Sequence, residues 1–219
     1  MKKSLSFLAA LVMVICMLAV TAAAEGTLTI VTTTYPLYDI ARSLCGELAD
    51  IRYAPEDAQA QAEDADIVLC VGGEEDAWAD VLPGVTVVKA MDNIELIEGD
   101  QDVLTIPINC ILCASYLADA LAGLDAANAA AYQANLSTYM DEMISMDNHI
   151  RETVTADMKV SCPDGSMAYF AKEYGVTFVQ DAQDAVALST FNTPSEDMLE
   201  IPYVTLLHSN LHALAGQAE

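Results

Sequence analysis

The 219-residue sequence predicts an α/β fold with two small lobes, each a parallel sheet flanked by helices, joined by one long helix. Two observations indicate this fold. Short β-branched runs alternate with helix-like segments on both sides of the middle of the chain, which is typical of parallel α/β layers. Between them, residues 126–155 show one continuous helical pattern, and about 30 residues give a helix roughly 45 Å long, more than a small domain is wide.

The middle helix is predicted by six apolar residues at alternating spacings of four and three, which place one apolar stripe along a helix face. Asp125 is a suitable N-cap, and Ala129 and the two alanines after it favour helix. The stripe lasts only about three heptads and has strand-like sequence on both sides, so a lobe-connecting helix is favoured over a coiled coil. The stripe consists of Tyr132, Leu136, Tyr139, Met143, Met146 and Ile150.

The N-terminal lobe is expected over residues 25–125. The runs 27–33 and 67–71 are mostly apolar, as buried parallel strands are, and the first of them is β-branched. Pro36 and Gly46 mark the start and end of the first helix of this lobe. The expected strands are 27–33, 51–54, 67–71 and 85–89, and the expected helices are 36–45, 58–65 and 106–124.

The C-terminal lobe is expected over residues 156–219. About 60 residues are few for a complete α/β layer, so this lobe is predicted to be abbreviated. The expected strands are 158–161 and 176–179, the expected helices are 167–174 (with Gly175 following its last residue) and 201–214, and residues 181–197 are expected to form a loop.

The first 24 residues have the pattern of a cleaved signal peptide. Lys2 and Lys3 form a basic start, an apolar run follows, and Ala22 to Ala24 form a small-residue cleavage site. A membrane anchor is the alternative, because the apolar run could just span a bilayer. The small residues at its end favour cleavage, so we expect an exported protein, in the periplasm or on the outer side of the membrane.

The charge balance excludes some classes of partner. Without Lys2 and Lys3 the chain has 6 basic and 33 acidic residues, a formal charge of −27. Nucleic acid is therefore not an expected partner, whereas cations are attracted. Five cysteines follow the signal peptide, an odd number that leaves at least one thiol unpaired within the chain. No catalytic motif is present, so an enzyme is not expected.

Five segments in order resemble a known family, the zinc- or manganese-binding substrate-binding proteins of bacterial ABC importers (solute-binding protein family 9). The resemblance implies a divalent cation, Mn or Zn, bound between the lobes, an importer permease as a partner, and a monomer. The segments are 31–41 (VTTTYPLYDIA), 65–68 (ADIV) with Trp78, 118–125 with the middle helix, 169–175 (YFAKEYG), and 203–214.

The usual ligands of this family, three histidines and one carboxylate, are replaced here. Where the resemblance places the histidines, this chain has Glu56 or Asp57, Asp102 and Asp164, and the region of the last carboxylate is shortened. Carboxylates select hard cations such as Mn²⁺, where three imidazoles favour Zn²⁺. The alternative is that the site has decayed and these aspartates are turn residues, since Asp164 lies in a Pro-Asp-Gly turn signal.

A second candidate site uses sulfur. Cys110 and Cys113 form a Cys-Xaa-Xaa-Cys at the start of a helix, and Cys162 could supply a third thiolate. Buried apolar thiols or a local disulfide are the alternative. His208 and His212 have the i, i+4 spacing that can bind zinc or copper, but a solvent-facing pair is favoured, and His149 is expected at the surface.

We therefore expect an exported metal-ion-binding protein of the importer type. The alternatives are a degenerate binding or scaffold protein that keeps the fold without metal, and a thiol-redox protein that uses Cys110 and Cys113.

Overall fold

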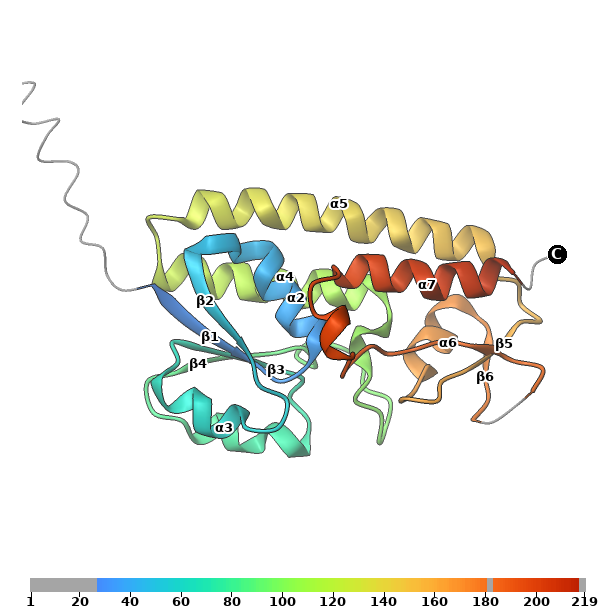
Figure 1. Cartoon of the computed structure of the whole chain (residues 1–219), viewed down its shortest axis with the longest axis horizontal. Helices are drawn as coiled ribbons and strands as arrows, with labels where there is room; N and C mark the ends of the chain where they lie inside the picture. Colours follow the sequence, from blue (N-terminus) through green and yellow to red (C-terminus); the bar gives the residue numbers. More distant parts are fainter. Residues whose placement is uncertain (1–26, 181–182, 217–219) are drawn as a thin grey trace, which may run out of the picture.

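The computed structural model describes residues 27–180 and 183–216. The predicted signal peptide lies outside these residues. The described chain forms two parallel sheets beneath a layer of long helices (Figure 1), which confirms the predicted fold class.

The first sheet has four parallel strands in the order β2-β1-β3-β4. α2 and α4 lie on one face of this sheet and α3 lies on the other (Figure 1). Its elements are β1 (Leu28–Thr32), α2 (Tyr35–Cys45), β2 (Ala49–Tyr53), α3 (Ala58–Gln61), β3 (Ile67–Cys70), β4 (Thr86–Lys89) and α4 (Pro107–Leu124), with single 3-10 segments at Gly46–Leu48, Ala62–Asp64, Glu74–Val81 and Val103–Thr105.

The second sheet is smaller, with three parallel strands in the order β6-β5-β7. Its elements are β5 (Lys159–Ser161), α6 (Ala168–Tyr174), β6 (Thr177–Phe178), β7 (Val186–Ala187), a 3-10 turn at Glu196–Met198 and α7 (Tyr203–Ala215). Gly175 ends α6 in the left-handed conformation, with a φ of 71°, as glycine allows. The prediction of a loop over 181–197 was wrong at β7, whose two residues pair with β5.

The long helix is α5 (Ala129–Thr153), which packs against α2, α4 and α7. Its buried residues are the six of the predicted stripe, all in one hydrophobic core that continues under both sheets. The N-cap prediction was wrong, because Asn128 and not Asp125 precedes the helix. The Asp125 carboxylate instead accepts hydrogen bonds from the Asn128 side chain and the Tyr132 hydroxyl, and these bonds stabilise the turn between α4 and α5.

Among the described residues, α4 is the helix long and apolar enough to cross a membrane by length and composition. Half of it is buried within the protein, and it packs against α5, α2 and β4. These contacts account for its apolar composition, since the core helix of a protein meets the same criteria.

Candidate metal-binding cleft

A cleft of about 980 Å³ lies where the two sheets approach each other. In the order β2-β1-β3-β4, β2 is added on one side of β1 and β3 on the other, so the strand order reverses between β1 and β3. Open parallel sheets bind ligands beyond the carboxyl ends of the strands at such a point. Thr33 and Thr34 follow β1 and Val71 follows β3, and all three line the cleft. Ser166, from the loop after β5, closes it from the second sheet.

The cleft is strongly acidic, and the described residues that line it include no Lys, Arg or His. The hydroxyl oxygens of Thr33 and Thr34 are buried there without a hydrogen-bond partner among the described residues. The cleft thus offers oxygen donors and a negative potential, which suits a cation. The acidic lining residues are Glu56, Asp57, Glu63, Glu75, Asp76, Asp100 and Asp102.

Asp102 lies at the centre of contacts between the two halves of the cleft. Its carboxylate accepts one hydrogen bond from the backbone N–H of Ser166 at 2.6 Å and one from the Asn192 side chain at 2.6 Å. Burial raises the pKa of Asp102; these two hydrogen bonds oppose the rise, and the carboxylates of Asp100 and Asp164 add to it. A cation at this position would relieve the repulsion between the carboxylates.

Asp164 lies in the turn after β5, behind the wall of the cleft. Its carboxylate accepts hydrogen bonds from the Ser189 hydroxyl at 2.5 Å, the Thr190 N–H at 3.2 Å and the Cys162 thiol at 3.0 Å. Burial tends to raise its pKa, but the hydrogen bonds outweigh burial and hold the pKa of Asp164 below its ordinary value. Gly165 separates it from Asp102.

Gly165 allows the turn after β5 to pack closely on Asp102. A Cβ atom on Gly165 would lie 2.7 Å from Oδ2 of Asp102 and 2.7 Å from the Thr190 methyl carbon. No side-chain carbon fits at such distances, so a glycine here lets the turn after β5 pack on Asp102. This explains the glycine of the Pro-Asp-Gly turn without a metal.

Glu56 and Asp57 lie in the exposed turn between β2 and α3. Both line the cleft together with Asp102, as the sequence predicted for one site, whereas Asp164 is outside the lining. Asp57 accepts a hydrogen bond from the Gln61 side chain at 3.0 Å. In the described part of the chain no group of three or more His, Cys, Asp or Glu side chains already has metal-ligating geometry. The predicted ligand set therefore stays a prediction.

Sequence reasoning missed three residues of this site. Asp100 accepts hydrogen bonds from the Ser166 hydroxyl at 2.6 Å and from the Asp102 N–H at 2.8 Å, and Asn192 holds the other oxygen of Asp102. Asp100 could have been found, because it is two residues from Asp102 in the chain. Nothing in the sequence marked Ser166 or Asn192, which lie 64 and 90 residues from Asp102.

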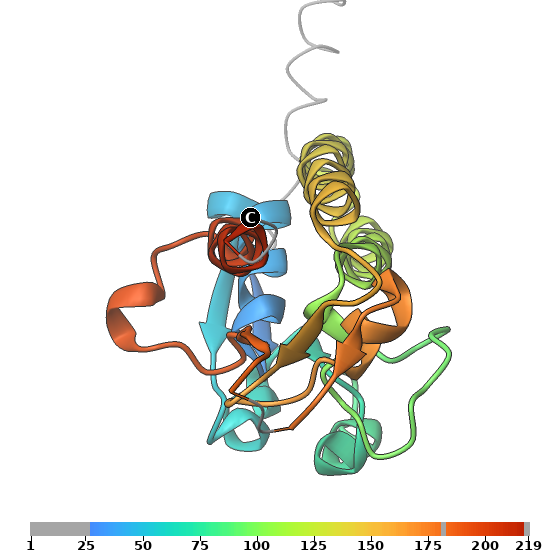
Figure 2. The ribbon, with the colours of Figure 1, turned by 90° about the vertical axis from the view of Figure 1, so that its right-hand side faces the viewer.

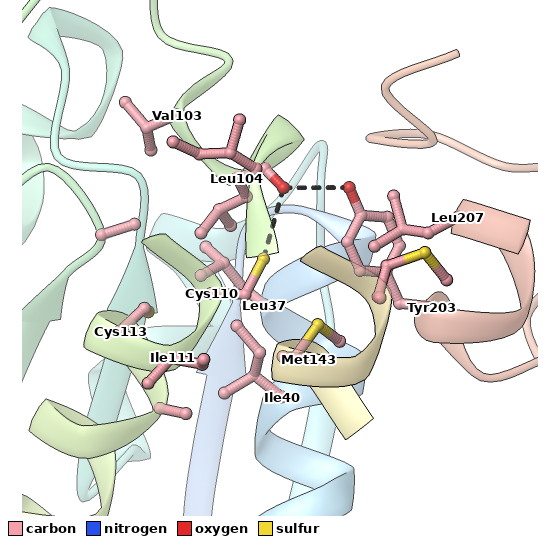
Figure 3. Close-up of a cluster of buried hydrophobic side chains, with 14 of the residues drawn as sticks. Leu37, Ile40, Val103, Leu104, Cys110, Ile111, Cys113, Met143, Tyr203 and Leu207 are labelled. Carbon is pink, nitrogen blue, oxygen red and sulfur yellow. Dashed lines mark hydrogen bonds between the residues drawn. The ribbon is translucent and has the colours of Figure 1, made fainter. Parts of the chain in front are cut away.

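The cysteines of the alternative site are buried. The Cys110 thiol donates to the Leu104 carbonyl at 3.3 Å, and the Tyr203 hydroxyl donates to the same oxygen at 3.1 Å (Figure 3). Burial raises the pKa of Cys110 and of Cys162 to about 12 and that of Cys113 further. The five cysteines of the described chain are all reduced and buried. Such thiols stay protonated near neutral pH, which disfavours both thiolate ligation and redox exchange.

Several solved structures share this fold. The chain superposes on the Zn(II)-bound ZnuA-like domain of AdcA from Streptococcus pneumoniae with a TM-score of 0.74 and 19% identity, covering 87% of this chain and 98% of that domain. It covers only 57% of the longer AdcA chain, at a TM-score of 0.75 and 18% identity. For the metal-dependent lipoprotein YcdH of Bacillus subtilis the TM-score is 0.76 at 18% identity, covering 86% of this chain and 98% of that one.

A fourth structure, FpvC of Pseudomonas aeruginosa in complex with Mn²⁺, matches with a TM-score of 0.67 and 18% identity over 88% of this chain and all of that one. Comparison with curated protein sequences gave no significant match. The family profile described as zinc-uptake complex component A, periplasmic, matches residues 30–201, well over half of the chain. This match confirms the resemblance of the five sequence segments, and the chain belongs to the ZnuA family.

Proposed function

We propose that this protein is the exported, metal-binding component of an ABC importer, and that it holds a divalent cation in the acidic cleft between its two lobes. The lobes are residues 25–125 and 156–219, joined by the helix within 126–155. One observation carries the proposal: a ZnuA-family chain has an acidic cleft at the carboxyl ends of β1 and β3, the position at which open parallel sheets bind ligands.

The chemistry of the cleft favours a hard cation. The predicted ligands there, Asp102 with Glu56 or Asp57, provide carboxylate oxygens, and the Thr33 and Thr34 hydroxyls provide further oxygens. Oxygen ligands suit Mn²⁺ better than Zn²⁺. AdcA is a Zn(II)-bound structure and FpvC a Mn²⁺ complex, so both metals occur in this fold, and the loss of histidines shifts the preference of this chain toward Mn²⁺.

The test is thermal unfolding with Mn²⁺ and, separately, Zn²⁺ under reducing conditions. A ligand at a hundredfold excess over Kd stabilises the folded state by about 2.7 kcal/mol. For a chain of this length we expect a rise in Tm of roughly 5 to 10 °C. Asp102→Asn should remove most of the rise, and Asp164→Asn should remove it if that carboxylate turns into the cleft. Asp141→Asn, an exposed charge on α5, is the matched control.

A second candidate function is favoured by a different observation. The oxygens of Asp102 and Asp164 already accept hydrogen bonds from the protein, and no metal-ligating group of three is preformed in the described chain. These facts support a ZnuA-type fold that acts as a binding or scaffold protein without metal. If Mn²⁺ does not change Tm and Asp102→Asn leaves any effect of Zn²⁺ unchanged, this candidate replaces the first.

The same assay distinguishes metal binding at the thiol site from metal binding in the acidic cleft. If Zn²⁺ stabilises the reduced protein and Cys113→Ser abolishes the effect, Cys110, Cys113 and Cys162 hold the metal. A gene for a permease and one for an ATPase beside this gene would support transport. Their absence would favour the scaffold.

A further inference from the structure

The three histidines of the entire chain, far apart in the sequence, meet in one surface groove. His149 comes from α5, and His208 and His212 come from α7. The groove has a volume of about 410 Å³ and also contains Glu152 of α5. It lies on different elements from those that form the acidic cleft. α5 and α7 lie side by side in both views (Figures 1 and 2).

The helices present these side chains in pairs. His208 and His212 are four residues apart and His149 and Glu152 three apart, and residues at these spacings neighbour each other on a helix, with Cβ atoms about 5 to 6 Å apart. Since both pairs line one groove, three imidazoles and one carboxylate face a common space. All four residues are exposed, so their side chains can rotate without disturbing the core.

The ends of the helices add a favourable field. α5 and α7 run in the same direction, and both end at the same side of the molecule (Figure 1). His149 is four residues before the last residue of α5, and His212 is three before that of α7. A helix carries about half a negative charge at its C-terminus, which stabilises a cation within the last turn. Two such ends meet at this groove.

We propose that His149, His208, His212 and Glu152 bind a borderline divalent cation of the zinc class, at a site separate from the cleft. Three neutral imidazoles with one carboxylate form a typical four-coordinate set for Zn²⁺, and imidazole also suits Cu²⁺ and Ni²⁺, whereas Mn²⁺ prefers oxygen. No group of three among the described residues has ligating geometry. Binding at this site therefore requires the four exposed side chains to rotate onto the metal. The site does not depend on the proposed transport function.

The experiment is a Zn²⁺ titration of the reduced protein at neutral pH, followed by proton NMR of the histidine rings and by calorimetry. With three histidines in the chain, single His→Gln variants assign all ring signals. All three signals should change together and reach their end point at one Zn²⁺ per chain. His149→Gln, His208→Gln and His212→Gln should each weaken Zn²⁺ binding by at least the roughly 10- to 100-fold that loss of an outer-sphere partner costs.

The variants decide between outcomes. Asp102→Asn should leave the histidine shifts unchanged, which separates this site from the cleft, and Mn²⁺ should not produce them. If His149→Gln binds Zn²⁺ as tightly as the unchanged protein, the two helices do not share a metal and the proposal is wrong. It is equally wrong if the three ring signals respond at different Zn²⁺ concentrations. Circular dichroism checks that each variant is folded, as substitution of an exposed histidine should allow.

Discussion

Asp102 is predicted to hold the two halves of the cleft together even without a metal, through its hydrogen bond with Asn192. The perturbation is a double-mutant cycle of Asp102→Ala and Asn192→Ala, measured in the presence of a chelator. The backbone carbonyl of Asn192 also accepts hydrogen bonds, from the Tyr35 N–H and the Tyr53 hydroxyl, and the substitution leaves those intact. The cycle therefore isolates the side-chain contact.

The magnitude follows from the geometry. A hydrogen bond to a charged group contributes about 1.5 to 3 kcal/mol, and Asp102 accepts two, both at 2.6 Å. Burial and the carboxylates of Asp100 and Asp164 raise the pKa of Asp102, so the charged form loses part of this gain. We expect Asp102→Ala to lower the free energy of unfolding by about 2 to 3 kcal/mol, of which about 1 to 2 kcal/mol is coupling with Asn192.

The assay is equilibrium unfolding in urea, with the midpoint and the slope fitted for the four proteins. Glu56→Ala is the control, since Glu56 is an exposed carboxylate of the same cleft, and its effect should stay within about 0.5 kcal/mol. If the two substitutions are additive within about 0.3 to 0.5 kcal/mol, the Asp102–Asn192 contact contributes nothing to stability and the reasoning is refuted.

Three further predictions concern the charge, the core and the thiols. The folded state raises the pKa of Asp102 above its unfolded value, so folding takes up protons in the pH range between the two values. The free energy of unfolding of the protein, compared with that of Asp102→Asn, should therefore increase as the pH falls through the folded pKa toward 3.8. A difference that does not depend on pH would contradict this. Met143→Ala, at a fully buried position of α5, should lower the free energy of unfolding by about 2 to 5 kcal/mol, and Ile144→Ala, at an exposed neighbour, should lower it much less. Equal losses in urea unfolding would show that the buried stripe of α5 does not provide the packing energy. Cys110 and the other four described cysteines should resist alkylation at neutral pH until the protein unfolds, and mass spectrometry showing rapid native labelling of Cys110 would restore the thiol-redox alternative.

The candidate site was only partly predictable. The resemblance placed Asp102, Glu56 and Asp57 in one site, and all three line the cleft. It also placed Asp164 there, but the structure turns this carboxylate toward Ser189 and Thr190, behind Gly165. The place of Asp164 in the sequence correctly indicated that it lies near the cleft. The direction of its side chain depended on hydrogen-bond donors 25 and 26 residues away.

The sequence by itself determined the elements whose patterns are local. The stripe from Tyr132 to Ile150 is the buried face of α5, because a helix repeats every 3.6 residues and its buried side can be read from nearby spacing alone. The central strands β1 and β3 were likewise marked by apolar, β-branched runs, because these two strands are buried along most of their length.

Only the tertiary structure decided what depends on contacts between distant segments. β7 has two residues, too few to show a period, and it is a strand because β5 lies beside it. Asn192 reaches Asp102 across 90 residues, and His149 of α5 lines one groove with His208 of α7; the local sequence shows no trace of either juxtaposition. Packing of the two lobes brings these side chains together, and the free energy of that packing is spread over the entire core, so no short segment encodes it.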